Sequence, residues 1–237
     1  MMSSHTPQKK PVPALVSAGV IAALTMLGLY RMLTHTGGGI LIVSGVRNLK
    51  HFTVDSNLLL GLVCLAYIVL TAAGVTARHP AVWLLAERAL YVATVSVALT
   101  FTVVMLFFVP QTGLAPMIQG ANLWFHLIDP VLAVVTFCAF HRDRRIPLRE
   151  TAAALAPTVV YAVYYTAVVL VRGVHFPDTD WYGFTRGGVT GSIATAAGIL
   201  LITWLLALAL RLAAGGRISR KTADNTDNTD NTETMNP

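Results

Sequence analysis

Charged side chains are scarce in this chain. Asp, Glu, Lys and Arg together account for 12% of its 237 residues, whereas 55% of the residues are hydrophobic. A soluble domain carries charge on about a quarter of its residues. Long apolar runs with few charges are instead typical of membrane spans, each of which needs roughly 20 residues to cross the hydrocarbon. The composition therefore indicates an integral membrane protein.

Cysteine and several catalytic signatures are also lacking. The two cysteines, Cys64 and Cys138, lie within apolar runs and form no CxxC pair, which argues against redox chemistry and thiolate metal sites. HExxH and Walker motifs are absent. The Gly-x-Ser-Gly of rhomboid-like proteases is missing too, because "LIVSGV" around Ser44 lacks its first glycine. We expect no metal and no cofactor.

The positive charge of the chain does not indicate a nucleic-acid partner. The formal net charge is +6, but the basic residues lie in short loops and tails between apolar runs. That distribution is typical of topology signals and of attraction to anionic lipid. We therefore expect the bilayer as the partner, and no nucleic acid.

Six apolar runs predict the fold class. Backbone groups inside a bilayer must bond within their own segment, and the alternation typical of barrel strands is absent, so the runs are expected to be helices. The sequence thus predicts an all-α, polytopic membrane protein with six transmembrane helices. The predicted spans are Val12–Leu33, Ser56–Ala77, Ala81–Val109, Asn122–Phe140, Thr151–Val171 and Val189–Leu212.

The basic loops predict the orientation of these spans. Lys9 and Lys10 precede the first span, and Arg78, "HRDRRIPLRE" and "RLAAGGRISRK" fall on the same side of the membrane. The positive-inside rule places that side, with both termini, in the cytoplasm. We expect a cytoplasmic tail over 1–11, the membrane domain over 12–212, and a basic tail over 213–237. The tail ends in the repeat "DNTDNTDNTETMNP", which has little to bury and is expected to be disordered.

Polar residues gather at the outer end of the second span, in "HFTVDSNLLL". Thr53, Ser56 and Asn57 are spaced i, i+3 and i+4 and share one helix face. Such residues commonly satisfy the free N–H groups of a helix start, and for this cluster alone a helix cap is the favoured interpretation. The alternative is that they form the mouth of a functional site.

A second polar stripe crosses the fourth span, "ANLWFHLIDPVLAVV". Asn122, His126 and Asp129 are spaced i, i+4 and i+7, and His126 lies roughly 6 Å below the helix start, at a depth matching Thr53. Imidazole is well suited to accept a hydroxyl proton near neutral pH, and Asp129 would orient the ring or stabilise its charged form. The alternative is that His126 and Asp129 only hydrogen-bond to one another and help to hold the helices together.

A third group lies in the cytoplasmic half of the third span. Glu87, Tyr91 and Thr94 share a face, whereas Arg88 points elsewhere and is suited to reach the headgroups. We interpret this group as structural.

With these spans and clusters in place, the chain resembles the androgen-induced-gene and ADTRP-like family of six-helix membrane proteins, and most closely its bacterial members. Three patches carry the resemblance: "HFTVDSNLLLGLV", "NLWFHLIDPVLAVV" and "DWYGFTRGGVTGSIATAAGI". With the order of spans, they cover most of Leu15 to Leu212. The chain departs from the family in its last outer loop, where "WYGFTRGG" replaces a proline-rich "WYPYPF"-like run.

The resemblance implies a function. Animal members of the family are described as threonine hydrolases of fatty acid esters of hydroxy fatty acids. It would carry their nucleophile to Thr53 and their histidine to His126, the two residues paired above by depth.

Two hypotheses follow for the chain. The first is an intramembrane lipid-ester hydrolase at the outer leaflet of the plasma membrane, with oxyanion donors from Asn57 and Asn122, and with Ser56 as a weaker candidate. The second is a non-catalytic bundle that binds or transports lipid, in which the same polar pocket holds a headgroup.

Overall fold

Six helical segments dominate the computed structural model, which describes residues 12–34, 45–141, 146–175 and 178–230. These segments are long and apolar enough to span a membrane, and the described ranges contain helices and no strand. This confirms the all-helical prediction with six candidate spans. Their bounds are Val12–Thr34, Phe52–Ala72, Pro80–Thr112, Ala121–Phe140, Leu148–Arg172 and Gly188–Ala214. The predicted tail over 1–11 lies outside the described residues.

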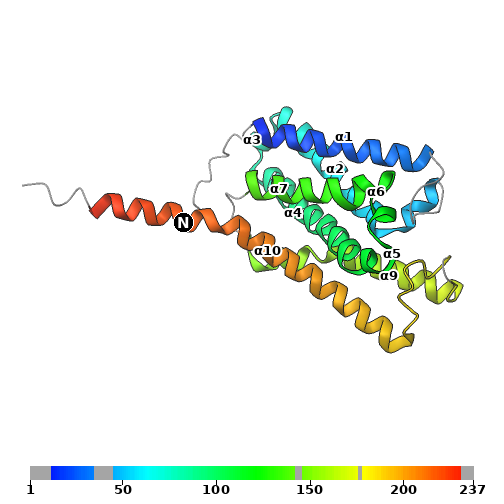
Figure 1. The fold of residues 1–237 in the computed structure, drawn as a ribbon. Helices are drawn as coiled ribbons and strands as arrows, with labels where there is room; N and C mark the ends of the chain where they lie inside the picture. The colour runs from blue at the N-terminus through cyan, green and yellow to red at the C-terminus, as the bar shows by residue number, and fades with distance from the viewer. Residues whose placement is uncertain (1–11, 35–44, 142–145, 176–177, 231–237) are drawn as a thin grey trace, which may run out of the picture.

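Short helical elements interrupt and connect these spans (Figure 1). Two of them, η2 and η4, are π-helical turns that continue α4 and α6. In chain order the elements are α1 (Val12–Thr34), η1 (Gly45–Lys50), α2 (Phe52–Ala72), α3 (Val75–Arg78), α4 (Pro80–Val103), η2 (Val104–Phe108), α5 (Val109–Thr112), η3 (Ala115–Met117), α6 (Ala121–Leu123), η4 (Trp124–Ile128), α7 (Asp129–Phe140), α8 (Leu148–Ala153), α9 (Ala156–Arg172) and α10 (Gly188–Asp230).

The second span begins and ends earlier than predicted. Helix α2 starts at Phe52 instead of Ser56, so Thr53 lies inside its first turn. It ends at Ala72 instead of Ala77, because Gly74 adopts a left-handed conformation with φ of 67° and separates α2 from α3. The N-cap residue is His51, and no side chain caps the helix start. The structure therefore does not support a capping role for the Thr53 hydroxyl.

The core of the bundle is formed by α1, α2, α4 and α7. Helix α1 packs along α2 and α7, and α4 packs against both α2 and α7 (Figure 1). Ile21, Leu60 and Val97 are buried where these helices meet. Gly61 of α2 allows a close approach of α1, because a Cβ atom there would stand 2.8 Å from Cγ2 of Thr25.

Helices α9 and α10 lie at the periphery of the bundle. Over an 18-residue stretch of each of these spans, only 17% of the residues are buried inside the protein, against 39–50% in the other four spans. Large apolar side chains such as Val160, Leu170 and Ile193 are exposed on them. Such surfaces suit contact with lipid tails.

Helix α10 continues past the predicted end of the last span at Leu212. Its backbone remains helical to Asp230 and projects away from the other helices (Figure 1). The predicted disordered repeat is therefore helical in its first part, and residues 231–237 lie outside the described residues. No proline occurs between Gly188 and Asp230, so nothing removes a backbone donor from the helix.

The close approach at Gly61 generates a stability prediction. In Gly61→Ala the new methyl group would displace Thr25, which is fully buried and donates to Asp129 Oδ2 at 3.0 Å. We expect a loss of about 1–3 kcal/mol from overpacking. In the matched control, Gly19→Ala, the nearest atom to the new Cβ is 3.9 Å away. That variant should be neutral or gain up to about 1 kcal/mol from helix propensity. Thermal unfolding in detergent measures both, and equal midpoints would contradict this account.

Candidate functional site

A large cavity lies between α2, α4, α9 and α10. Its volume is about 490 Å³, within the usual range for small-molecule sites. Its walls are mainly aliphatic and aromatic, with Val103, Val169 and Leu200 among the side chains that line it. The residues that line it also include Thr53 and three tyrosines, Tyr161, Tyr165 and Tyr182. An apolar chamber with a few polar groups suits a lipid.

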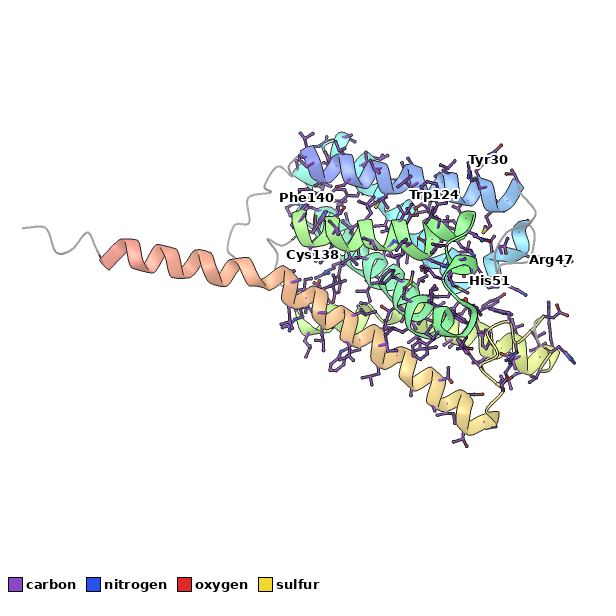
Figure 2. All side chains as sticks on the ribbon, in the orientation of Figure 1. Tyr30, Arg47, His51, Trp124, Cys138 and Phe140 are labelled. Atoms are coloured by element: carbon purple, nitrogen blue, oxygen red, sulfur yellow. The ribbon has the colours of Figure 1, made fainter. Side chains whose placement is uncertain are left out.

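The start of α2 lies at one end of this bundle. Figure 2 shows His51 and Arg47 at that end, and Cys138 and Phe140 at the opposite end. His51 has an extended backbone before the helix, with φ of −98° and ψ of 130°. Thr53 follows two residues later and is 8% exposed, facing the cavity.

Asn57 connects Thr53 to the residue beside His126. Its Nδ2 donates to the Thr53 carbonyl at 2.7 Å and to the Phe125 carbonyl at 3.1 Å. Both N–H groups of this fully buried amide are therefore used. One side chain thus holds the start of α2 against the π-turn η4.

The Phe125 carbonyl needs this donor because of the π-turn. In η4 the Asp129 N–H bonds to the Trp124 carbonyl, five residues back, instead of to Phe125. The next residue, Pro130, has no N–H to offer. Phe125 therefore has no donor from its own helix, and a buried carbonyl without a partner costs about 1–3 kcal/mol.

The hydrogen bond of His126 determines its tautomer. Its Nδ1 lies 2.7 Å from the Met117 carbonyl, which can only accept, so Nδ1 carries a proton. In the neutral ring Nε2 is then the atom with a lone pair, as a general base requires. His126 is 5% exposed and is not one of the residues that line the cavity. Within the described ranges no hydrogen bond joins it to Thr53.

The expected stripe through Asn122, His126 and Asp129 does not form. Asn122 Nδ2 donates to the Pro116 carbonyl at 3.2 Å, and Asp129 accepts from Thr25 of α1 instead of orienting His126. Within the described ranges no hydrogen bond joins Asp129 to His126, so the structure does not support the expectation that Asp129 orients the ring. The cause is η4, because a π-turn adds a residue to the helix and changes which positions share a face.

Ser56 has a structural connection as well. Its hydroxyl lies 2.9 Å from Oγ1 of Thr100, on α4, and donates or accepts there; it also lies 3.1 Å from the Thr53 carbonyl. This pair ties α2 to α4 just behind the cavity, which Thr100 also lines.

The loop between α9 and α10 is rich in aromatic side chains and lines the cavity at the end where α2 begins. Trp181 Nε1 donates to Tyr161 at 3.0 Å, and the Tyr161 hydroxyl donates to the Lys50 carbonyl at 2.7 Å. Asp180 anchors the loop, because it accepts hydrogen bonds from the Tyr165 hydroxyl and from Thr185. Sequence reasoning missed these residues, since their partners are more than a hundred positions away or lie in a loop without periodicity.

The ionisable groups next to the spans have shifted pKa values. Burial lowers the pKa of His51 to about 4; its hydrogen bond to Asn48 opposes this effect, and nearby Lys50 and His126 add to it. His51 is therefore neutral at physiological pH, with Nδ1 turned to the Asn48 carbonyl at 3.2 Å. Burial would raise the pKa of Asp180, but its hydrogen bonds from Thr185 and Tyr165 outweigh burial and lower it. Asp180 thus anchors the loop as a carboxylate.

Another polar group lies at the opposite end of the bundle. His141 Nδ1 lies 3.1 Å from Glu87, and Arg88 pairs with Glu150 at 2.8 Å. Arg88 thus has a carboxylate partner instead of reaching freely to headgroups. These pairs tie α4 to the end of α7 and to α8 and leave the cavity untouched.

No protein-family model matches the chain, and neither a curated protein nor a solved structure is found to be similar.

The role of Asn57 can be tested with a double-mutant cycle. Asn57→Ala removes the donor to Phe125 and should cost about 1–3 kcal/mol of stability. Pro130→Ala supplies a new N–H, five residues beyond Phe125, that can replace it. We therefore expect Asn57→Ala to cost less in the Pro130→Ala background than alone. Asn122→Ala is the control, because its partner Pro116 is independent of the turn, and its cost should be the same in both backgrounds. Strict additivity for Asn57 would contradict the proposed coupling.

Proposed function

We propose that the protein is a lipid-ester hydrolase in which Thr53 is the nucleophile and His126 the general base. The observation that carries the proposal is the position of Thr53, whose side chain faces an apolar cavity of about 490 Å³ from the first turn of α2. The tautomer of His126, with Nε2 as the acceptor, supports the second assignment. The resemblance to the androgen-induced-gene and ADTRP-like family supports the same pair.

The reaction proceeds in two steps. The Thr53 oxygen attacks the ester carbonyl carbon while His126 Nε2 takes the hydroxyl proton. The tetrahedral intermediate collapses, the bond to the alcohol oxygen breaks, and the imidazolium returns the proton to the leaving alcohol. Water then attacks the acyl-threonine with help from the same imidazole and releases a fatty acid. The acyl chain lies among the aliphatic side chains of α4, α9 and α10.

The base has a competitor at the site. His51 is two residues from Thr53, its Nδ1 also donates to a carbonyl, and its ring contacts Trp181 and Tyr182. Catalytic hydrogen bonds are often long in the absence of substrate, so the lack of a Thr53–His126 bond is compatible with either histidine. We assign the base to His126 because its shorter bond to Met117, at 2.7 Å, fixes the ring more firmly.

One observation favours a second candidate function. His126 is not among the residues that line the cavity, so the same chamber could hold a lipid without reacting. The protein would then be a lipid-binding or transport bundle.

Activity measurements on matched variants test the hydrolase proposal. In detergent, the protein should hydrolyse a long-chain p-nitrophenyl ester and react covalently with a fluorophosphonate probe. Thr53→Val keeps the side-chain shape and should abolish both, and His126→Gln should lower turnover about 10²–10⁴-fold. Thr158→Val is the control, because Thr158 also lines the cavity and that variant should keep its activity.

His51→Gln distinguishes the two histidines. Turnover should remain high in this variant, whereas loss here and retention in His126→Gln would reassign the base to His51. A wild-type protein that neither turns over nor reacts with the probe, but retains lipid with and without Thr53→Val, would favour the binding function.

We further propose that the site faces the outer leaflet of a plasma membrane. The basic residues near the α2–α4 connection and after the last span favour a cytoplasmic location for that end and for both termini. The start of α2 and the turn η4 belong to the other end of the bundle.

Cysteine accessibility tests this orientation. In a chain with both native cysteines replaced by alanine, Thr112→Cys and Ala77→Cys each place one thiol at an exposed position. Thr112 ends α5 at the site end, and Ala77 lies in α3 at the opposite end. An impermeant maleimide should label position 112 in intact cells and position 77 only after lysis. The reverse pattern would place the site on the cytoplasmic side.

A further inference from the structure

Helix α10 is attached to the bundle along the part of its span that lies far from the site. The Tyr91 hydroxyl of α4 donates to the Ala207 carbonyl at 2.7 Å, and Ala207 and Leu210 are buried in one apolar cluster with Tyr91. Among residues 188–214 of α10, whose side chains the structure describes, none before Thr203 is buried. Figure 1 shows α10 meeting the other helices along its middle and diverging from them toward its start.

The first turns of α10 are not tied to α9, the helix on the other side of the cavity. The side-chain hydrogen bonds of α10 go to its own turns, to the loop before it, to α4 and to Ile146, and within the described ranges none joins it to α9. A Cβ atom added at Gly188, Gly191 or Gly198 would meet no atom of another element within 4 Å. This part of α10 therefore stands clear of its neighbours on the side of these glycines.

The cavity reaches the surface of the protein between α9 and α10. Leu170 of α9 and Val189 and Ile193 of α10 all line it, yet these residues are 78%, 78% and 65% exposed. Ala196, about one turn further along α10, lines it and is exposed as well. A residue that borders a cavity and is also open to the outside marks its mouth. All four belong to candidate membrane spans, so in a bilayer they face lipid.

We propose that this mouth, formed by Leu170, Val189, Ile193 and Ala196, is a lateral portal through which the acyl chain of a bilayer lipid enters the cavity. The ligand is then a long-chain lipid drawn from the membrane itself, and not an ester dissolved in water. The portal goes beyond the proposed hydrolase function, because a protein that only binds lipid would use the same route.

The chemistry of the portal suits an acyl chain. Its four residues are aliphatic, and among the described residues no Asp, Glu, Lys, Arg or His lines the cavity. An ionic group that entered here would lose its hydration without gaining a charged partner, which is costly. A hydrocarbon chain only exchanges contacts with other lipid tails for similar contacts with aliphatic side chains, so its entry carries no such cost.

Entry from the bilayer also suits the position of Thr53, if the proposed hydrolase function holds. Thr53 lies in the first turn of α2, at one end of the bundle, and lines the same cavity as the portal residues. In a membrane lipid the ester lies next to the headgroup, above the hydrocarbon. A lipid whose chain passes between α9 and α10 therefore keeps its ester near the depth of the proposed nucleophile.

Photolabelling from the bilayer tests the portal without requiring catalysis. The protein is reconstituted into vesicles in which part of the phosphatidylcholine carries a diazirine on its acyl chain; light expels nitrogen, and the carbene inserts into nearby bonds. Leu99 and Val104 of α4 line the cavity and are only 2% and 4% exposed, so label on them reports a chain inside it. We expect mass spectrometry to find adducts on both. Label confined to outward-facing residues would overturn the proposal.

Bulky substitutions locate the route of entry. Ile193→Trp and Ala196→Trp fill the portal and should lower the labelling of the cavity residues about 10–100-fold, the effect of crowding a space that is already filled. Leu201→Trp is the matched control, because Leu201 is 55% exposed on the same helix but does not line the cavity. All three positions are exposed, so the larger side chain disturbs no core packing. Equal labelling in all three variants would mean that the chain enters elsewhere.

Turnover provides a second measurement, which depends on the hydrolase function. Ile193→Trp and Ala196→Trp should lose about 10–100-fold in turnover of a long-chain p-nitrophenyl ester presented in vesicles. Both should retain turnover of p-nitrophenyl acetate, because this ester is too small to be excluded and keeps the reaction itself unchanged. An equal loss for the two esters would mean that the tryptophan disturbs the site instead of blocking the portal.

The two measurements separate the portal from the hydrolase function. If bilayer lipid labels the cavity through the portal but the wild type hydrolyses neither ester, the portal stands and the hydrolase function fails. If turnover depends on Thr53 while the tryptophan variants are labelled like the wild type, the hydrolase stands and the portal is refuted.

Discussion

The geometry of the site depends on the Asn57 side chain. Its amide nitrogen holds two carbonyls from helices that are distant in the sequence, Thr53 of α2 and Phe125 of η4. Inside a bundle without bulk water, a carbonyl that has lost its helical donor has few alternatives. The π-turn before Pro130 creates that need, and Asn57 satisfies it. The same contact that stabilises the helix pair therefore sets the distance between the proposed nucleophile and the proposed base.

The two ends of the bundle use polar groups differently. At the Glu87 end, a carboxylate–histidine pair and an arginine–glutamate pair join side chains of different helices. At the Thr53 end, His126 and His51 bond to backbone carbonyls through Nδ1, and among the described residues no hydrogen bond occupies the Nε2 atom of either ring. Buried polar groups are usually satisfied, so a cluster with capacity left over beside an apolar cavity is suited to bind or transform a ligand.

Most of the fold could be predicted from the sequence, because length and hydropathy alone constrain a membrane span. The six predicted spans match the candidate membrane spans within a few residues, and the largest difference between them, at the ends of α2, came from Gly74 and from an N-terminus without a side-chain cap. Beyond its span, α10 continues to Asp230. The stripe through His126 and Asp129 failed for a different reason. It assumed α-helical spacing, whereas Pro130 leaves a π-turn in the helix. The proline was visible in the sequence, and a proline inside an apolar helix is a signal that spacing rules fail nearby.

The tyrosines show why the rest of the site could not be predicted. Tyr182 and Phe52 are 130 residues apart, and Tyr161 and Lys50 are 111 residues apart, so no local period relates them. Their contacts depend on how α9 and the loop after it fold over the start of α2. That arrangement also explains why a peripheral pair of helices matters for a site whose nucleophile lies on the core. Helices α9 and α10 bury little of their own surface, yet with α4 they enclose the apolar chamber. Helix α9 contributes Tyr161 and Tyr165 to its lining, and the loop after α9 contributes Tyr182. The core thus fixes the nucleophile, while the loosely packed periphery leaves room for a lipid chain beside it.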